Sequence, residues 1–249
     1  MGKVKKFFKK IGGQIWEFIK SSFPATLMYL CAGASLLVFT MKGDNPYAWD
    51  QDKLIWIVIC SLVVIAYNCL LAYGEGGQAY EMLVSGNMKR KSALQYGDEL
   101  RISVHKEVKE YRVWKGFAIG AVCGLFTMIA GIIFGTNTEK VNVVFQEGGS
   151  WPKGFGVLVI VLFVLSGWSM LPLFYLNGAG HSISYFMGCA FAVLPILITG
   201  IMYVVGAYGK RNKNMRKQAL AEQSEREKAN KTTKVNYGGL PGTKPKKRK

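Results

Sequence analysis

Five stretches of this chain contain no Asp, Glu, Lys or Arg over lengths close to the roughly 20 residues with which a helix crosses a bilayer's hydrocarbon core. They are residues 23–41, 54–73, 116–135, 154–176 and 183–208. An unpaired backbone amide costs several kcal/mol in lipid, so each stretch is predicted to be helical. The sequence therefore predicts an all-α, polytopic membrane helical bundle with five hydrophobic segments.

The charged residues are segregated from these segments. The formal net charge is +17, although 50% of the residues are hydrophobic. A nucleic-acid-binding domain spreads its basic residues over a folded surface, whereas here they crowd between and beyond the apolar segments. This argues against a nucleic-acid partner and favours a multi-pass protein of the cell membrane, in contact with a bilayer that carries anionic headgroups.

The pattern divides the chain into three regions. Residues 1–22 form a basic arm whose apolar residues recur at three- and four-residue spacing, which predicts an amphipathic helix on the cytoplasmic leaflet, weakened at Gly12 and Gly13. Residues 23–208 form the transmembrane domain, with a cytoplasmic loop at 74–115. Residues 209–249 form a basic, largely disordered C-terminal tail, which begins with a polar helix from Lys210 to about Asn230.

The positions of the basic residues predict the sidedness of the chain. The N-terminus and the loop 74–115 are rich in Lys and Arg, whereas the intervals 42–53 and 136–153 hold two lysines each. The positive-inside bias therefore places the N-terminus in the cytoplasm. Five plain crossings would then export the tail, although its first residues are strongly basic.

Two topologies follow from this conflict. In the first, one segment is re-entrant or strongly broken, most plausibly in the last pair, where Pro172 and Pro195 interrupt the hydrogen-bond ladder, and the tail is cytoplasmic. In the second, five plain crossings leave an exported basic tail. We expect the first, because basic residues close to a segment resist translocation.

Small residues lie along one face of the third segment. The glycines of this face are Gly116, Gly120, Gly124, Gly131 and Gly135. Lipid gives helices no hydrophobic reason to associate, so close backbone approach along small residues drives packing. We expect this face to be buried within the chain; the alternative is the seam of a homo- or hetero-oligomer.

A glycine cluster follows the second segment, in the sequence YGEGGQAYE. A phosphate-binding loop needs a preceding strand and a nearby lysine, whereas this cluster follows a membrane segment and contains Glu75. Glycine at a helix C-terminus supplies a left-handed turn. Gly74, Gly76 and Gly77 are therefore predicted to form a hinge that turns the chain along the membrane surface.

The residues that carry chemistry are few. Asn177, His181 and Ser182 form a polar turn between the last two segments and are the best candidates for a site, although an interfacial histidine more often caps a helix or bonds a carbonyl. The five cysteines all lie inside the segments and are interpreted as packing residues. No catalytic set, cofactor site or metal site is predicted.

Short similarities suggest a duplication. In the first and third segments a cysteine is followed twelve residues later by Gly-x-Asn, beginning at Cys31 and Cys123. This pattern predicts a weak repeat of two hairpins, as is common in transporters. The predicted function is a non-enzymatic packing or scaffold subunit of a membrane assembly. The alternative is a permease or channel component for a neutral or weakly polar solute.

Overall fold

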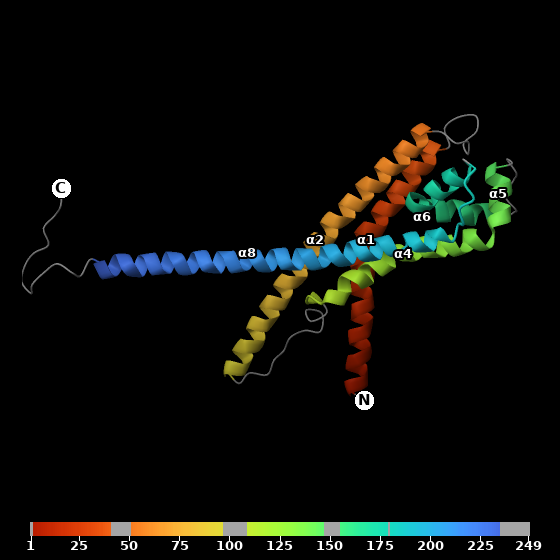
Figure 1. Ribbon diagram of the computed structural model, residues 1–249. Coiled ribbons are helices and arrows are strands. Elements are labelled where there is room, and N and C mark those ends of the chain that lie inside the picture. Colours follow the sequence, from red (N-terminus) through yellow and green to blue (C-terminus); the bar gives the residue numbers. More distant parts are fainter. Residues whose placement is uncertain (1, 41–50, 97–108, 147–154, 179, 235–249) are drawn as a thin grey trace, which may run out of the picture. The chain divides into compact units, whose positions relative to one another are not determined.

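The described part of the chain consists of helices joined by short turns and contains no strand (Figure 1). The computed structural model describes residues 2–40, 51–96, 109–146, 155–178 and 180–234. Its helices are α1 (Gly2–Thr40), α2 (Gln51–Tyr96), α4 (Val113–Thr136), α5 (Thr138–Gln146), α6 (Phe155–Gly178), α7 (Met187–Phe191) and α8 (Val193–Lys234). They fall into two compact units, Met1–Ala207 and Tyr208–Lys249. The predicted all-α class is confirmed.

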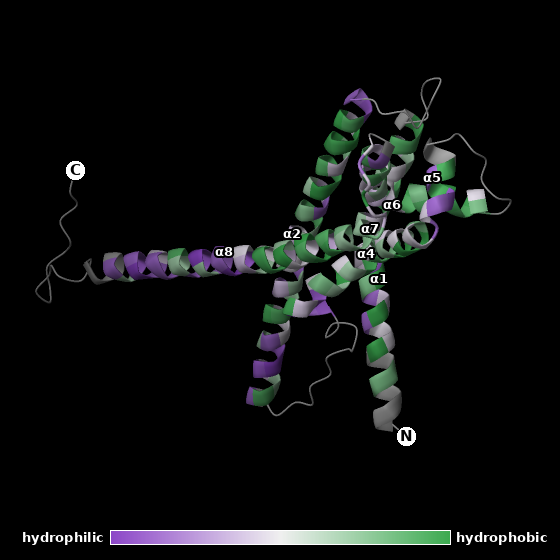
Figure 2. Ribbon diagram, turned by 45° about the vertical axis from the view of Figure 1, so that its right-hand side comes forward, coloured by the Kyte–Doolittle hydropathy of each residue, from purple (hydrophilic) through white to green (hydrophobic). Residues whose placement is uncertain are grey.

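Five helical stretches are long and apolar enough to cross a membrane, as the sequence predicted. They are Ile11–Val38, Gln51–Gln95, Val113–Thr136, Phe155–Asn177 and Met187–Asn230. Figure 2 shows the hydrophobic colour along their central parts, with hydrophilic residues at the far end of α2 and along the last part of α8. The chain is a multi-pass membrane protein.

The N-terminal arm and the first hydrophobic segment form one helix. α1 runs without a break from Gly2 to Thr40, through Gly12, Gly13 and Pro24. A side chain added at Gly12 would meet nothing within 4 Å, so this glycine is not required for packing.

The predicted hinge is not formed, because α2 is a single helix of 46 residues that continues through Gly74, Gly76 and Gly77. Gly76 instead allows close approach between helices: a Cβ there would collide with the backbone carbonyl of Tyr203 in α8. Further along α2, the carbonyl of Ala79 accepts a hydrogen bond of 3.0 Å from the backbone N–H of Tyr111. These contacts hold the last part of α2 in line with the first.

Contacts between the helices define two ends of the first unit. At one end, Phe18 of α1 meets Trp114 at the start of α4. We call this the basic end, because the lysine-rich arm and the basic loop directly precede these two residues in the sequence. Along α4, Cys123 then lies beside Thr26, so α1 and α4 are parallel. At the other, the opposite end, Leu36 of α1 shares a cluster with Ile57 of α2. The start of α2 therefore lies beside the end of α1, and these two helices are antiparallel.

The glycine face of α4 packs against α7 and the first part of α8. Added Cβ atoms at Gly116, Gly124 and Gly135 would meet Tyr203, Ala192 and Phe186, respectively. This order makes α8 antiparallel to α4 and brings Tyr203 to the basic end. This face is therefore buried within the chain, as expected, and the alternative of an oligomer seam is not available on it because α7 and α8 already cover it.

α6 is bent between its two halves. The rings of Phe163 and Phe174 lie 4.8 Å apart, although eleven residues of straight helix would separate their backbones by about 16 Å. The bend coincides with Pro172, which cannot donate a backbone hydrogen bond to the carbonyl of Trp168. Pro195 lies just after a second irregularity, at Ala192 between α7 and α8, where the backbone keeps helical angles.

The freed carbonyl of Trp168 has a new partner. The hydroxyl of Ser61 in α2 donates to this carbonyl at 3.1 Å and shares its hydrogen with the carbonyl of Ile57 in its own helix at 2.8 Å. We predict that Ser61→Ala lowers the free energy of unfolding by about 1 kcal/mol, because the buried carbonyl loses this donor. Ser35→Ala is the control, since the Ser35 hydroxyl bonds only within its own helix, to Cys31. Equal effects in detergent unfolding titrations would contradict this role for Ser61.

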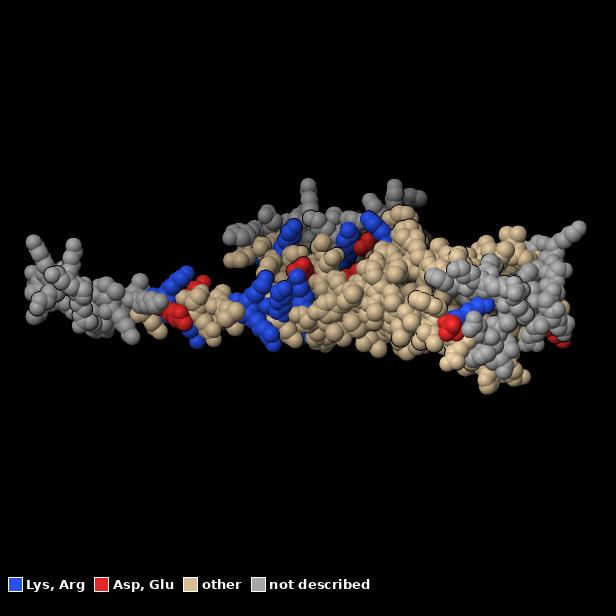
Figure 3. Space-filling model, turned by 90° about the horizontal axis from the view of Figure 1, so that it is seen from above, with Lys and Arg blue, Asp and Glu red and all other residues tan. Residues whose placement is uncertain are grey.

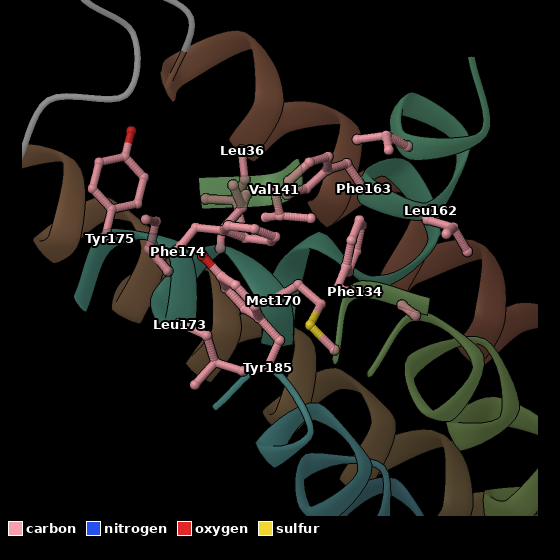
Figure 4. Close-up of a cluster of buried hydrophobic side chains, with 14 residues drawn as sticks. Leu36, Phe134, Val141, Leu162, Phe163, Met170, Leu173, Phe174, Tyr175 and Tyr185 are labelled. Carbon is pink, nitrogen blue, oxygen red and sulfur yellow. The ribbon is translucent and has the colours of Figure 1, made fainter. Parts of the chain in front are cut away.

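Both halves of α6 pack into one apolar cluster at the opposite end (Figure 4). The cluster joins Val159 and Phe163 from the first half with Leu173 and Phe174 from the second half. The ring of Phe134 in α4 contacts both Phe163 and Phe174, with centroid distances of 5.4 and 5.3 Å. The two ends of α6 are therefore held near the same end of α4.

In the second unit α8 continues from Tyr208 to Lys234 as a highly charged helix, and nearly all side chains of residues 211–230 are exposed. The helix thus ends close to the predicted position near Asn230, and residues 235–249 lie outside the described part. Figure 3 shows that Lys and Arg gather in patches separated by uncharged surface. No observation tests the two-hairpin repeat, which stays a prediction.

Candidate functional site

Four helices surround a cavity at the basic end. α1, α2, the segment that begins α4, and α8 line this space of about 170 Å³. Gln78 and Met82 of α2 are wall residues with exposed side chains, so the cavity opens to the surface beside them. None of the described residues of α6 lines it, because α6 ends near the opposite end.

Charges of both signs meet in this cavity. Glu17 comes from α1 and Glu75 from α2, while Lys109 and Lys115 lie at the entry to α4. Glu17 lies within electrostatic reach of both Glu75 and Lys115. Lys115 is only 4% exposed. Ionised residues are costly at such positions and are commonly kept for function.

Tyr203 forms the aromatic wall of the cavity and is fixed by its neighbours. A Cβ at Gly76 would strike its backbone, and one at Gly116 would lie 2.6 Å from its own Cβ. Its ring stacks on Tyr111 with a centroid distance of 5.5 Å. Gly76, assigned by sequence analysis to a hinge, therefore makes room for the backbone of Tyr203, and Gly116, assigned to a packing face, makes room for its side chain.

An ion pair fixes the segment that carries the two lysines. Arg90 of α2 donates hydrogen bonds of 2.7 and 2.9 Å to the two carboxylate oxygens of Glu110. Glu110 is 8% exposed, so the pair is better shielded from water than an ordinary surface pair. This contact and the Tyr111 to Ala79 bond anchor the entry to α4 on α2.

Polar groups continue from the cavity into the middle of the bundle. Trp168, near the bend of α6, packs on Tyr29 with a centroid distance of 4.9 Å. Asn68 is 2% exposed and its amide lies within reach of the Tyr29 hydroxyl, but neither amide atom makes a hydrogen bond of ordinary geometry among the described residues. The hydroxyl of Thr127 is likewise buried and without a partner there. Such groups destabilise a dry interior.

The predicted polar turn has a structural role. The side chain of Asn177 spans the turn, accepting from the N–H of Ile183 at 2.7 Å and donating to its carbonyl at 2.8 Å. His181 and Ser182 are exposed on the surface of the turn. The three residues therefore do not converge on one site.

We predict that Asn177→Ala lowers the free energy of unfolding by about 1–3 kcal/mol. The Ile183 carbonyl loses its donor, and the Ile183 N–H keeps only its bond of 3.0 Å to the carbonyl of His181. His181→Ala should have no measurable effect, since that side chain is exposed. Thermal unfolding of the two purified variants in detergent measures the difference. A larger loss at His181 would contradict this assignment.

The cysteines lie apart from this site chemistry. All five are free thiols. The buried Cys123 contacts Thr26 and the carbonyl of Ser22 across the α1 to α4 interface, as a packing residue would. Among the described residues, no group of three or more His, Cys, Asp or Glu side chains could hold a metal ion.

Sequence analysis did not group the charged residues of the cavity. Each lies beside a different hydrophobic segment, and Lys115 directly precedes the third. One feature of the sequence could have indicated the site: Glu17, Glu75 and Lys115 all lie on the side of the membrane that sequence analysis assigned to the cytoplasm. Charges that flank separate segments on one side can meet in the folded bundle.

The fold and the cavity define a polytopic α-helical membrane protein with a charged pocket at one end of its bundle. No protein-family model, curated protein or solved structure matches the chain. The function must therefore be argued from the geometry.

Proposed function

We propose that the protein is a permease or channel component that passes a small solute of no net charge, and that it is not an enzyme. The observation that carries the proposal is that α6 bends back within the helical bundle. Its Trp168 packs with Ala25, Val64 and Cys123, near the middle of three other helices. Beyond the bend, its contacts are with the opposite end.

A half-spanning helix of this kind is typical of conducting proteins. Re-entrant elements and broken helices are tolerated at membrane depth only where protein buries them or where they line a water-filled space. The apolar window of α6 is 61% buried, the largest share among the five candidate spans. The open cavity occupies the half of the bundle that α6 does not enter.

The basic tail favours the same arrangement. In the proposed topology α6 is re-entrant, so four helices cross the membrane and α8 returns to the basic end. The arm, the loop 74–115 and the tail then all lie in the cytoplasm, as the positive-inside bias requires. Every strongly basic region of the chain faces the anionic leaflet in this arrangement.

Asn68 is the proposed contact for the solute between the cavity and the bend of α6. A buried amide without a well-formed hydrogen bond lowers the stability of the fold. The same amide can bind water or a solute that enters the bundle. We expect Asn68→Leu to abolish conduction while leaving the fold as stable or more stable. A purely structural asparagine would show the reverse, with lost stability and no specific loss of conduction.

The experiment is a stopped-flow osmotic assay of proteoliposomes with gradients of glycerol, urea or glycine. Faster equilibration of at least one solute than in protein-free vesicles is expected, together with its loss in Asn68→Leu. Ala66→Leu, on an exposed position of the same helix, is the matched control and should conduct normally. Vesicles that equilibrate all three solutes at the protein-free rate would refute the proposal.

A scaffold subunit is the second candidate, and the exposed helix of residues 211–230 favours it. That helix offers basic and acidic side chains to a partner or to anionic headgroups. The glycine face of α4 is not its contact, because that face is buried within the chain. Native purification of the full chain would reveal stoichiometric subunits in this case, and their loss when residues 211–249 are deleted.

A further inference from the structure

The cavity at the basic end is small and carries a balanced set of charges. Its volume of about 170 Å³ is similar to that of an engineered cavity of about 150 Å³ that holds benzene. Two carboxylates, Glu17 and Glu75, are matched by two ammonium groups, Lys109 and Lys115. A solute with a single net charge would leave one of these groups without compensation.

The two signs of charge come from different helices. The carboxylates belong to α1 and α2, and the lysines enter with the segment that Arg90 and Glu110 anchor. Phe18, Ile119 and Tyr203 provide apolar wall between them. An aromatic ring also favours a cation placed over its face.

We propose that this cavity binds a small zwitterion, an amino acid with one ammonium and one carboxylate on a short carbon chain. Glu75 and Glu17 bind the ammonium, and Lys115 and Lys109 bind the carboxylate. A charge-assisted hydrogen bond at each end replaces the water that both groups lose on entry. The proposal names the solute class of the proposed pathway and rests on that function, although binding is measured separately from conduction.

The structure favours this solute over a lone ion. Glu17 already interacts with both Glu75 and Lys115. A cation or an anion alone would therefore compete with one of these side chains for its partner of opposite charge. A zwitterion gives both members a new partner at once. Its zero net charge also suits a pathway whose middle offers neutral polar groups such as Asn68.

The test is isothermal titration calorimetry of the full-length protein in nanodiscs. The probes are glycine, 3-aminopropanoate, 4-aminobutanoate and 5-aminopentanoate, with butylamine and butanoate as the two halves of one of them. At least one zwitterion should bind at least about tenfold more tightly than either half. Equal binding of the halves, or no saturable binding of any zwitterion, would overturn the proposal.

Charge-removing variants distinguish a binding role from a structural one. Glu75→Gln and Lys115→Met should each weaken zwitterion binding about tenfold or more. Lys115→Met should also bind butylamine more tightly than the wild type, and Glu75→Gln should bind butanoate more tightly, because each leaves one opposite charge without compensation. The proposal would be contradicted if both variants lost zwitterion binding and neither bound its single-charge probe more tightly than the wild type.

Glu81→Gln and Lys89→Met are the controls, since both residues lie on α2 away from the cavity and are exposed. They should bind like the wild type, and an equal loss in them would count against the cavity. Binding without conduction in the osmotic assay would refute the proposed function alone. Conduction without zwitterion binding would refute this inference alone.

Discussion

Replacing Gly76 with leucine is expected to prevent the bundle from folding, whereas Gly74→Ala, two residues away in the same helix, should be tolerated. A Cβ at Gly76 would collide with the backbone of Tyr203, and a backbone cannot move aside as a flexible side chain can. Overpacking of this kind typically costs about 1–3 kcal/mol or more. At Gly74, a Cβ meets nothing within 4 Å.

The two substitutions distinguish a hinge at the glycine cluster from an unbroken, closely packed helix. If the cluster were a hinge, alanine at either position would restrict it. In an unbroken helix, Gly74→Ala should instead raise the free energy of unfolding by up to about 1 kcal/mol. Fluorescence-detected size exclusion and detergent unfolding titrations measure both effects, and a wild-type profile for Gly76→Leu would show that α2 and α8 do not pack here.

Cysteine labelling should place residues 139 and 182 on one side of the membrane and residues 92 and 224 on the other. The variants Glu139→Cys, Ser182→Cys, Ser92→Cys and Ser224→Cys each replace an exposed residue and are made in a chain without native cysteines. Residues 139 and 182 precede and follow α6, so a re-entrant α6 leaves both on the same side. An impermeant maleimide should modify these two in intact cells and the other two only in inverted vesicles.

The expected difference is all or none, because an impermeant reagent reaches only one face. If α6 crossed the membrane, positions 139 and 182 would react from opposite sides. Residue 224 would then react from the same side as residue 139. Either result would refute the proposed topology, while reaction of residue 92 from inverted vesicles alone serves as the reference for the cytoplasmic face.

The sequence alone predicted the class of fold and the five segments, because the cost of charge and unpaired backbone in lipid acts on each residue separately. It also predicted that the glycines of α4 would pack closely. It did not predict that Gly76 belongs to the same contact, since Gly76 and Gly116 are joined only through Tyr203 of a third helix. Local glycine content favoured a turn, and tertiary packing kept α2 straight.

The candidate site depended on the tertiary structure. Asn177, His181 and Ser182 are adjacent in sequence and formed a plausible polar cluster, yet the fold uses Asn177 to close a turn and leaves the other two exposed. Glu17, Glu75 and Lys115 are far apart in sequence and meet only because three helices pack at one end. The free energy of placing a residue in lipid depends mainly on that residue, so the sequence alone predicts the membrane segments. A pocket depends on how several helices pack against one another, which no single segment specifies.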